Sequence, residues 1–383
     1  MKITDINVYP LSAETPERLW TAHEVLHASS LIIVEVKTDE GVTGYGMIHG
    51  EPQKAICDWV KRFADIVRGM DPLGHADIWE KLFLLTCPRP DGLNGSGGLP
   101  PPLPRGARPQ IMAAIGGIDI ALWDLKGKAA KLPVYKLLGG TRNSFFTYAT
   151  GGYYHEGATP EAYARELASF VEAGYRAVKL KCCGGTMAYE VERIRAVREA
   201  IGKDVLFMLD MNAAYTVDEC IRFAHLVEPY DIFWLEEPLH WYLQPADFLR
   251  VAAATHIPLA HGERELTRFT TRDFIASGAI RFVQFDSTRY AGFSEGLRVA
   301  HLAEQHGVRI APHCVPEIHT HLCSAFASAS FAVETIGNDR RDIIGKGIYA
   351  RGPVVRDGEV HVPDAPGFGF EIDWDFARRY AAK

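Results

Sequence analysis

Short apolar strands alternate with amphipathic helices from Thr141 onward, and this alternation limits the possible folds more than any other feature of the sequence. The unit recurs roughly every 20 to 30 residues, which is typical of strand–helix units in a parallel sheet. A total of about eight strands favours a closed β/α barrel. The strands are predicted at residues 146–150, 177–181, 205–210, 232–236, 257–263, 281–286, 308–313 and about 331–335.

Helix starts between these strands support the same fold. Thr159 and Pro160 have the residue types of a cap and a first helical position, and Thr216 with Glu219 predicts a capping box. An open doubly wound sheet is the alternative, but it would usually carry a Gly-rich phosphate turn after its first strand. The segment Gly151-Gly152-Tyr153-Tyr154 lacks that motif, so the barrel is favoured.

The first 140 residues have a different pattern and predict a separate domain. One stretch between its helices is too rich in Pro and Gly for regular structure, and it would be either a surface excursion or a lid over a site. A boundary is expected after Gly139-Gly140, where the last helical pattern stops. The predicted elements are a hairpin of strands at 31–37 and 41–46, helical segments at 54–86 and 111–138, and the loop at 88–109.

Composition excludes several classes of protein. The formal net charge is −7 with the two signs interspersed, so a basic nucleic-acid surface and a membrane-binding stripe are not indicated. Seven cysteines without a CxxC pair argue against a disulfide framework and a zinc finger. The start of the chain lacks a signal-peptide pattern, and no apolar run reaches the roughly 18 residues of a membrane span. We expect a cytoplasmic protein whose partners are small molecules or copies of itself.

Three successive strands each end on a carboxylate: Asp210, Glu236 and Glu263. In a parallel barrel the carboxyl ends of the strands line the active site, so these side chains are expected to converge. Three anions at one point require a cation, and hard oxygen ligands suit Mg²⁺ better than Zn²⁺. Three separate solvated strand ends would require a coincidence repeated in consecutive units.

Two lysines and a histidine supply candidate acid–base groups. Lys179 and Lys181 share one face of a strand, and repulsion between them is expected to lower a lysine pKa towards neutrality. Asp286 and His313 end neighbouring strands, and a carboxylate bonded to an imidazole is typical of a general base. Taken alone, such lysines are more commonly charged strand ends that reach water, and a lone histidine is more commonly a core residue. His313 differs from His319 and His321 in its position opposite the lysines.

Two further polar residues are weaker candidates. Asn212 follows Asp210 on the same face and would hold substrate or a metal-bound water. Glu334, near the last strand, would donate to a developing oxyanion if burial kept it protonated.

These residues resemble the enolase superfamily, in particular its mandelate racemase subgroup, over nearly the whole chain. The motifs that carry the resemblance are Ile118-Asp119-Ile120-Ala121-Leu122-Trp123-Asp124 before Leu137-Leu138-Gly139-Gly140, Lys179-Leu180-Lys181, Asp210, Leu235-Glu236-Glu237-Pro238, Gly262-Glu263, Asp286 and His313. The resemblance implies a modified (β/α)7β barrel in residues 141–345, an α+β capping domain in residues 1–140, and a segment, 346–383, that returns to the cap.

The resemblance also implies roles for these residues. Mg²⁺ would be held by Asp210, Glu236 and Glu263, with Glu237 beside the site but not a ligand. Lys181 and His313 would face opposite sides of a carbon acid, Lys179 would stabilise charge on its carboxylate, and Glu334 would be the electrophilic glutamate. Met211, Ala213 and Arg264 depart from the residues common in the family at these places. The departures change the surroundings of the ligands and leave the ligands intact.

Two activities follow from this resemblance. Removal of the proton α to a carboxylate would lead to dehydration of an acid sugar to a 2-keto-3-deoxy acid, or to racemisation or epimerisation of a 2-hydroxy acid. Tyr148 to Tyr154 is similar to the D-tartrate dehydratase branch, whereas Cys314 to His319 is closer to the racemase, so both stay open. A non-catalytic binding protein of the same fold is the remaining alternative. Substrate contacts are expected from His23, His49 and Arg289, and a homo-oligomer is expected.

Overall fold

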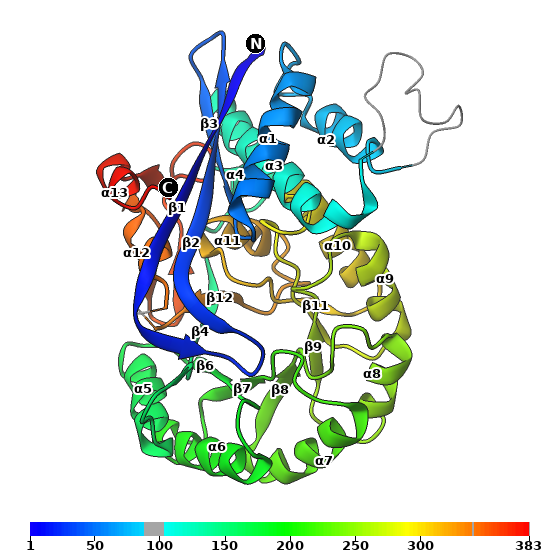
Figure 1. Cartoon of the computed structure of the whole chain (residues 1–383), viewed down its shortest axis with the longest axis vertical. Helices are drawn as coiled ribbons and strands as arrows, with labels where there is room; N and C mark the ends of the chain where they lie inside the picture. The colour runs from blue at the N-terminus through cyan, green and yellow to red at the C-terminus, as the bar shows by residue number, and fades with distance from the viewer. Residues whose placement is uncertain (88–102, 339–340, 383) are drawn as a thin grey trace.

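The computed structural model describes residues 1–87, 103–338 and 341–382. It has the predicted fold class, a modified (β/α)7β barrel with an α+β cap, and the cap lies across one end of the barrel (Figure 1). No helix in the described parts of the chain has the length and apolar character needed to cross a membrane.

The cap is an antiparallel sheet covered by helices. Its strands β1 (Ile3–Trp20), β2 (Val25–Thr38) and β3 (Thr43–Ile48) lie in the order β3-β2-β1, and β5 (Tyr154–His155) of the barrel part joins the free edge of β1. The predicted hairpin is therefore present but longer. β1 was not predicted, because Pro10 and Pro16 argue against a strand. The structure accommodates Pro16 at an irregularity between Glu14 and Leu19.

The cap helices differ from the predicted segments at their ends. The predicted helical segment 54–86 is two helices, α1 (Gln53–Val67) and α2 (His75–Leu84), separated by a turn with Gly69 at φ +78°. The predicted segment 111–138 is α3 (Arg108–Ala130) and the short α4 (Val134–Leu137). In the predicted loop 88–109, residues 88–102 lie outside the described residues, and residues 105–107 form a 3-10 turn leading into α3.

Helix α3 is buried almost throughout and ties the parts of the molecule together. β3 crosses it so closely that a Cβ at Gly44 would come within 2.1 Å of the carbonyl oxygen of Ala121. Asp119 accepts hydrogen bonds from the backbone and hydroxyl of Ser294, at the start of a barrel helix, at 2.8 and 2.7 Å. Asp124 accepts hydrogen bonds from the cap at Tyr45 and from the C-terminal segment at Phe368. These buried carboxylates explain polar residues in an otherwise apolar helix.

The barrel contains all eight predicted strands, separated by seven helices. The last strand pairs in parallel with the first, and Ile310 pairs with Ser330 just before the last strand, so the ring closes. The strands are β4 (Ser144–Gly151), β6 (Ala177–Lys181), β7 (Leu206–Asp210), β8 (Ile232–Glu236), β9 (Leu259–His261), β10 (Phe282–Val283), β11 (Arg309–Ile310) and β12 (Val333–Ile336). The helices are α5 (Pro160–Glu172), α6 (Met187–Ile201), α7 (Val217–Val227), α8 (Pro245–Ala252), α9 (Arg268–Ser277), α10 (Phe293–Gln305) and α11 (Pro316–Ala325).

Side chains alternate between the barrel interior and the helices, as the strand period requires. Val178 and Leu180 pack towards the helices in the main core, whereas Ala177 joins an interior cluster that fills the barrel. That interior cluster is Tyr148, Ala177, Met208, Trp234, Ala260, Phe282, Ala311 and Ala332. Residues two positions further along the same strands therefore face inward at the carboxyl end.

The C-terminal segment contacts both parts. Helix α12 (Ile343–Gly347) spans its predicted start at residue 346. The elements that follow are β13 (Tyr349–Arg351), β14 (Val354–Arg356), β15 (Glu359–His361), β16 (Glu371–Ile372) and α13 (Trp374–Arg379). β15 pairs with the first residues of β4 in the barrel, and Ala382 donates to Pro10 of the cap. The division of the chain into three domains stays a prediction.

Candidate active site

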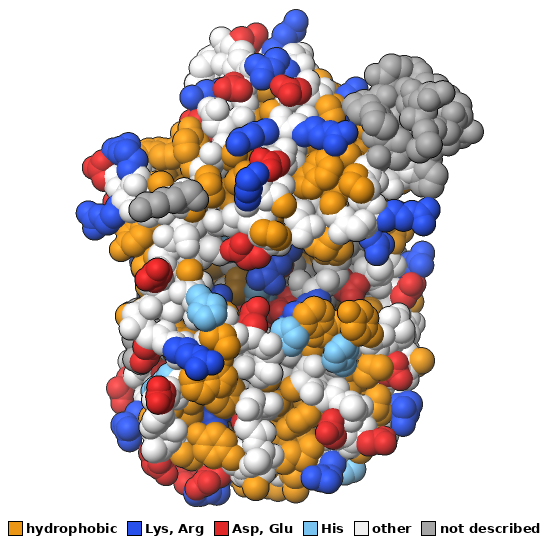
Figure 2. Space-filling view, viewed as in Figure 1, with side chains coloured by type: hydrophobic (Ala, Val, Ile, Leu, Met, Phe, Trp, Pro, Cys, Tyr) orange, Lys and Arg blue, Asp and Glu red, His pale blue; other side chains and the backbone are white. Residues whose placement is uncertain are grey.

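Polar residues gather where the barrel strands end beneath the cap. The cap reaches this end of the barrel at three places: Trp20 pairs with Tyr154, the Trp79 indole donates to Ala291 at 2.7 Å, and the His23 ring contacts that of Trp241. All three barrel residues follow strand ends. The recess between the two parts is visible in Figure 2.

The three predicted metal ligands converge. Asp210 ends β7, Glu236 ends β8, and Glu263 follows β9 by two residues. One oxygen from each lies within 4.8 Å of the others, and all three side chains are buried. Parallel register places Asp210 directly beside Glu236, which is why strand ends far apart in sequence meet.

Both lysines point into the same cluster. Lys179 bonds to Glu236 and lies 2.8 Å from Glu334, and Lys181 bonds to Asp210. Burial alone would lower the pKa of Lys179 and of Lys181, but the facing carboxylates raise both above their ordinary value. Lys179 does act to lower the pKa of Lys181, as expected, but the carboxylates outweigh this effect, so the expected net lowering is not found. A divalent cation would compete for the same carboxylates and weaken this effect.

His313 follows β11 and bridges two carboxylates. Its Nδ1 lies 3.0 Å from Oδ2 of Asp286, and its Nε2 lies 3.0 Å from Oε2 of Glu263. Burial would lower the pKa of His313, but contacts with Cys314, Glu263 and Asp286 raise it well above its usual value. Around the ring of eight strands, β6 with Lys181 and β11 are separated by three steps in one direction and five in the other. The two side chains thus approach the carboxylates from different sides.

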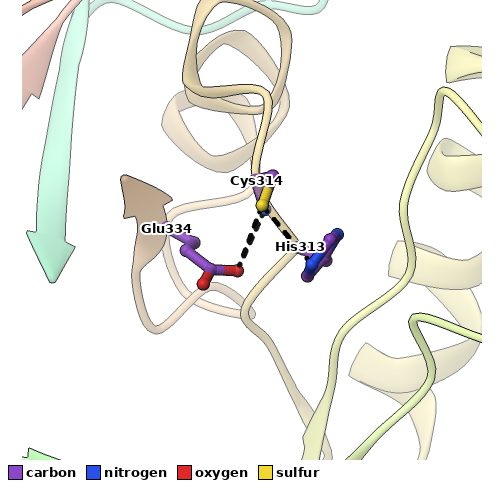
Figure 3. A group of neighbouring side chains, drawn as sticks. All are labelled: His313, Cys314 and Glu334. Carbon is purple, nitrogen blue, oxygen red and sulfur yellow. Dashed lines mark hydrogen bonds between the residues drawn. The ribbon is translucent and has the colours of Figure 1, made fainter. Parts of the chain in front are cut away.

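Glu334 and Cys314 complete this side of the cluster (Figure 3). The backbone N–H of Cys314 donates to Oε2 of Glu334 at 3.1 Å, and the Cys314 thiol lies 3.4 Å from Nε2 of His313. Thr150 donates to Oε1 of Glu334 at 2.5 Å. Burial would raise the pKa of Glu334, but Lys179 and His313 lower it to about 2. The expectation of a protonated Glu334 therefore does not match the charge state in this arrangement.

The donor set fits a hard divalent cation. Burial raises the pKa of Glu236. The negative charge of Asp210 raises it further, whereas the positive charge of Lys179 acts to lower it. Crowded carboxylates of this kind are relieved by a cation. Oδ1 of Asn212 and Oε1 of Gln284 are buried without a hydrogen-bond partner among the described residues. Oxygen-only donors of this kind match the preference of Mg²⁺.

The other predicted substrate residues lie at different depths. Asn212 is buried beside Asp210, to which its backbone N–H donates at 3.0 Å. His49 approaches the hydroxyl of Thr288 at 3.4 Å, and burial lowers its pKa to about 4. Arg289 lies 3.5 Å from Asp286, at the mouth of the site. His23 is exposed on the turn between β1 and β2.

Sequence reasoning missed the side chains that hold the candidate ligands in place. Gln284 and the indole of Trp234 both donate to Oε2 of Glu236, at 2.6 and 3.1 Å. The Thr288 hydroxyl donates to Asp286 at 2.6 Å. Gln284 and Trp234 stand two residues before a candidate site residue in the predicted strands 281–286 and 232–236, so the strand period of two could have found them.

This fold and site define a protein of the enolase superfamily. Residues 5–139 match the model of the mandelate racemase / muconate lactonizing enzyme N-terminal domain, and residues 162–376 match the enolase C-terminal domain-like model. The chain belongs to the mandelate racemase / muconate lactonizing enzyme family.

Named relatives include dehydratases and a racemase. The chain is 30% identical to an arabinonate dehydratase of Saccharolobus solfataricus, with 100% of both chains covered. It is similar to the structure of L-talarate/galactarate dehydratase from Salmonella typhimurium LT2 liganded with Mg and L-lyxarohydroxamate, with 28% identity, TM-score 0.85 and coverage of 100% and 93%. A racemase from Streptomyces coelicolor A3(2) with bound magnesium is 26% identical, with TM-score 0.85 and coverage of 99% and 100%.

Proposed function

We propose that this protein is a Mg²⁺-dependent hydro-lyase that dehydrates an acid sugar to a 2-keto-3-deoxy acid. The observation that carries the proposal is the placement of Lys181 and His313 on different sides of three converging carboxylates. Similarity to the arabinonate and talarate/galactarate dehydratases supports the same reaction class.

Asp210, Glu236 and Glu263 would hold the ion, which supplies positive charge to the substrate carboxylate as charge builds up on it. Lys179 adds a second positive charge at the same place, and burial at 0% exposure makes that charge effective. Proton removal from the α carbon needs this help because such a proton is very weakly acidic.

Proton transfer is assigned to the flanking groups. Lys181 takes the α proton at its Nζ, which requires that it be neutral when substrate arrives. His313 donates a proton from Nε2 to the departing β-hydroxyl, and Asp286 holds the ring through Nδ1. Loss of water then leaves an enol, which becomes the 2-keto acid.

Racemisation or epimerisation is the second candidate, and a specific observation favours it. With bases on two sides, a proton removed by Lys181 can be replaced from the opposite side by His313, which inverts the centre. The similarity to the Streptomyces coelicolor racemase supports this possibility.

The test is isotope exchange followed by product analysis. A panel of aldonic, uronic and aldaric acids is incubated in deuterated water with Mg²⁺ or with EDTA. The proposal expects α-proton washout and 2-keto acid with Mg²⁺, and neither with EDTA. Washout with inversion but without keto acid would favour the epimerase. The absence of washout from every acid would favour a non-catalytic binding protein.

We also propose a cytoplasmic location and a homo-oligomeric state. All seven cysteines are free, which agrees with a reducing compartment such as the cytoplasm. A homo-oligomeric state stays a prediction that sedimentation velocity would test.

A further inference from the structure

Three arginines near the mouth of the site have no role in the proposed chemistry: Arg264, Arg289 and Arg341. They come from three different segments, the turn after β9, the turn after β10 and the connection between β12 and α12. Guanidinium groups are costly to bury without acceptors, so their position calls for an explanation. Figure 2 shows Lys and Arg side chains set back in the recess between the cap and the barrel.

Arg264 is oriented but incompletely bonded. Its guanidinium lies 4.7 Å from the ring centre of Trp241, which also contacts the cap at His23. Its nearest carboxylate oxygens, on Glu237 and Glu263, are 3.7 and 3.8 Å away, longer than hydrogen bonds. Its Nε is buried without a hydrogen-bond partner in the described parts of the chain. The contact with Trp241 thus holds a guanidinium group that still has an N–H to donate.

Arg289 and Arg341 lie over opposite flanks of the site. Arg289 is 3.5 Å from Asp286, on the side of His313. Arg341 lies 5.9 Å from the ring centre of Tyr153, and Lys181 lies 5.8 Å from the same ring. The Nε of Arg341 is also buried and lacks a hydrogen-bond partner among the residues described.

The fields of these arginines overlap within the site. Arg264 and Arg289 both act to lower the pKa of Glu263, and Arg289 and Arg341 both act to lower that of His49. The contacts agree, because Arg264 and Arg289 lie 3.8 and 3.5 Å from Glu263 and Asp286, the two carboxylates that His313 contacts. Arg341 and Lys181 lie at the ring of the same tyrosine, Tyr153. The exposed Glu24 of the cap also acts on Arg289, after Asp286, Glu263 and Cys314.

We propose that Arg264, Arg289 and Arg341 bind a second carboxylate at the far end of the substrate, so that the preferred substrates are sugar diacids. A guanidinium binds a carboxylate through two parallel N–H donors. Arg264 and Arg341 each keep a buried Nε without a hydrogen-bond partner among the described residues, and Arg289 makes only a 3.5 Å contact with Asp286. A sugar monoacid presents a hydroxyl there, which is a weaker acceptor for these N–H donors than a carboxylate. The inference rests on the proposed function, because the first carboxylate would lie at the metal ligands.

The test compares acids that differ only at the far end. Galactarate with galactonate, and glucarate with gluconate, are compared by kcat/KM for 2-keto acid formation and by α-proton washout. The expected result is a preference for the diacid of at least about tenfold, the value of one charge-assisted hydrogen bond. Equal or faster reaction of the monoacids would overturn the inference and leave the proposed function standing. No reaction with either class would instead contradict the proposed function.

Variants of Arg341 separate recognition from folding, since this residue contacts neither a candidate metal ligand nor His313. Arg341→Met is expected to reduce the diacid-to-monoacid ratio of kcat/KM at least about tenfold, mainly by raising KM for the diacid. A merely structural role would lower both activities and keep the ratio. Arg341→Lys retains the charge without the planar guanidinium, so its ratio should fall between those of the wild type and Arg341→Met.

Arg195→Met, at an exposed pair with Glu199, is the matched control and should keep the ratio. An unchanged ratio in both Arg341 variants would overturn the inference.

Discussion

The Nδ1 atom of His313 lies 3.0 Å from Oδ2 of Asp286, and this contact leaves Nε2 directed at the carboxylate cluster. The other oxygen of Asp286 accepts hydrogen bonds from the backbone and hydroxyl of Thr288, at 2.9 and 2.6 Å. Burial would raise the pKa of Asp286, but His313 and Arg289 hold it below its usual range. Asp286 therefore stays ionised and fixes which ring nitrogen can exchange a proton with substrate.

Replacement of this imidazole should remove the acid of the proposed reaction. His313→Asn is expected to lower the rate of 2-keto acid formation by about 10³-fold, within the range for loss of a general acid. The rate is followed by keto-acid formation under saturating Mg²⁺. His301→Asn, on an exposed position of α10, is the control and should keep the wild-type rate. Turnover retained in His313→Asn would mean that the acid has been misassigned.

The amine of Lys181 is expected to be the base for the α proton. Lys181→Met should slow α-proton washout by about 10²-fold or more, because the other amine of the site, Lys179, is paired with Glu236 and Glu334. Nuclear magnetic resonance of the substrate in deuterated water measures the washout. The exposed Lys203→Met serves as control. Washout at the wild-type rate would assign the base elsewhere.

Binding of Mg²⁺ should stabilise the folded protein. Saturating Mg²⁺ is expected to raise the free energy of unfolding by about 3 kcal/mol at a hundred times Kd, and EDTA should reverse it. Glu263→Gln removes the negative charge of one candidate ligand and should abolish most of this stabilisation by Mg²⁺. Thermal denaturation with and without Mg²⁺ checks it, with the exposed Glu304→Gln as control. An undiminished Mg²⁺ effect in Glu263→Gln would exclude this residue as a ligand.

Stability should also fall in mild acid because of His321. This buried ring accepts a hydrogen bond from the backbone of Tyr135 at 3.1 Å and contacts the Phe368 carbonyl at 3.1 Å. Burial lowers its pKa to about 3 from an ordinary value near 6.5, so the unfolded chain binds the proton first. The contribution of neutral His321 to the free energy of unfolding is complete above pH 6.5 and is lost as the pH falls. The expected loss between pH 7 and pH 5 is about 2 kcal/mol.

Urea denaturation at pH 7 and pH 5 measures this loss. The variant His321→Gln should be less stable at pH 7 but should lose less stability on going to pH 5. Equal pH dependence in the variant and the wild type would assign the acid sensitivity to other groups.

The barrel was predictable from sequence because its signals are local and repeated. Each short, mainly apolar strand is followed by a helix, and Asp210 and Glu236 sit at strand ends, so topology alone brings them together. β1 was not predictable, because prolines mask it and its partner β2 supplies the pairing. The charge states of Lys179 and Glu334 were also beyond sequence reasoning. They depend on which opposite charges lie within about 3 Å, and this distance is set by the fold.

Strand β4 exchanges neighbours along its length, since its first residues pair with β15 and its later residues pair with β12. During synthesis on the ribosome, the earlier β strands emerge long before either partner exists. The growing chain therefore carries an open sheet edge until residues 333–336 and then 359–361 leave the exit tunnel. Closure of the ring, and with it the arrival of Glu334 beside Lys179, must be among the last events in the maturation of the molecule.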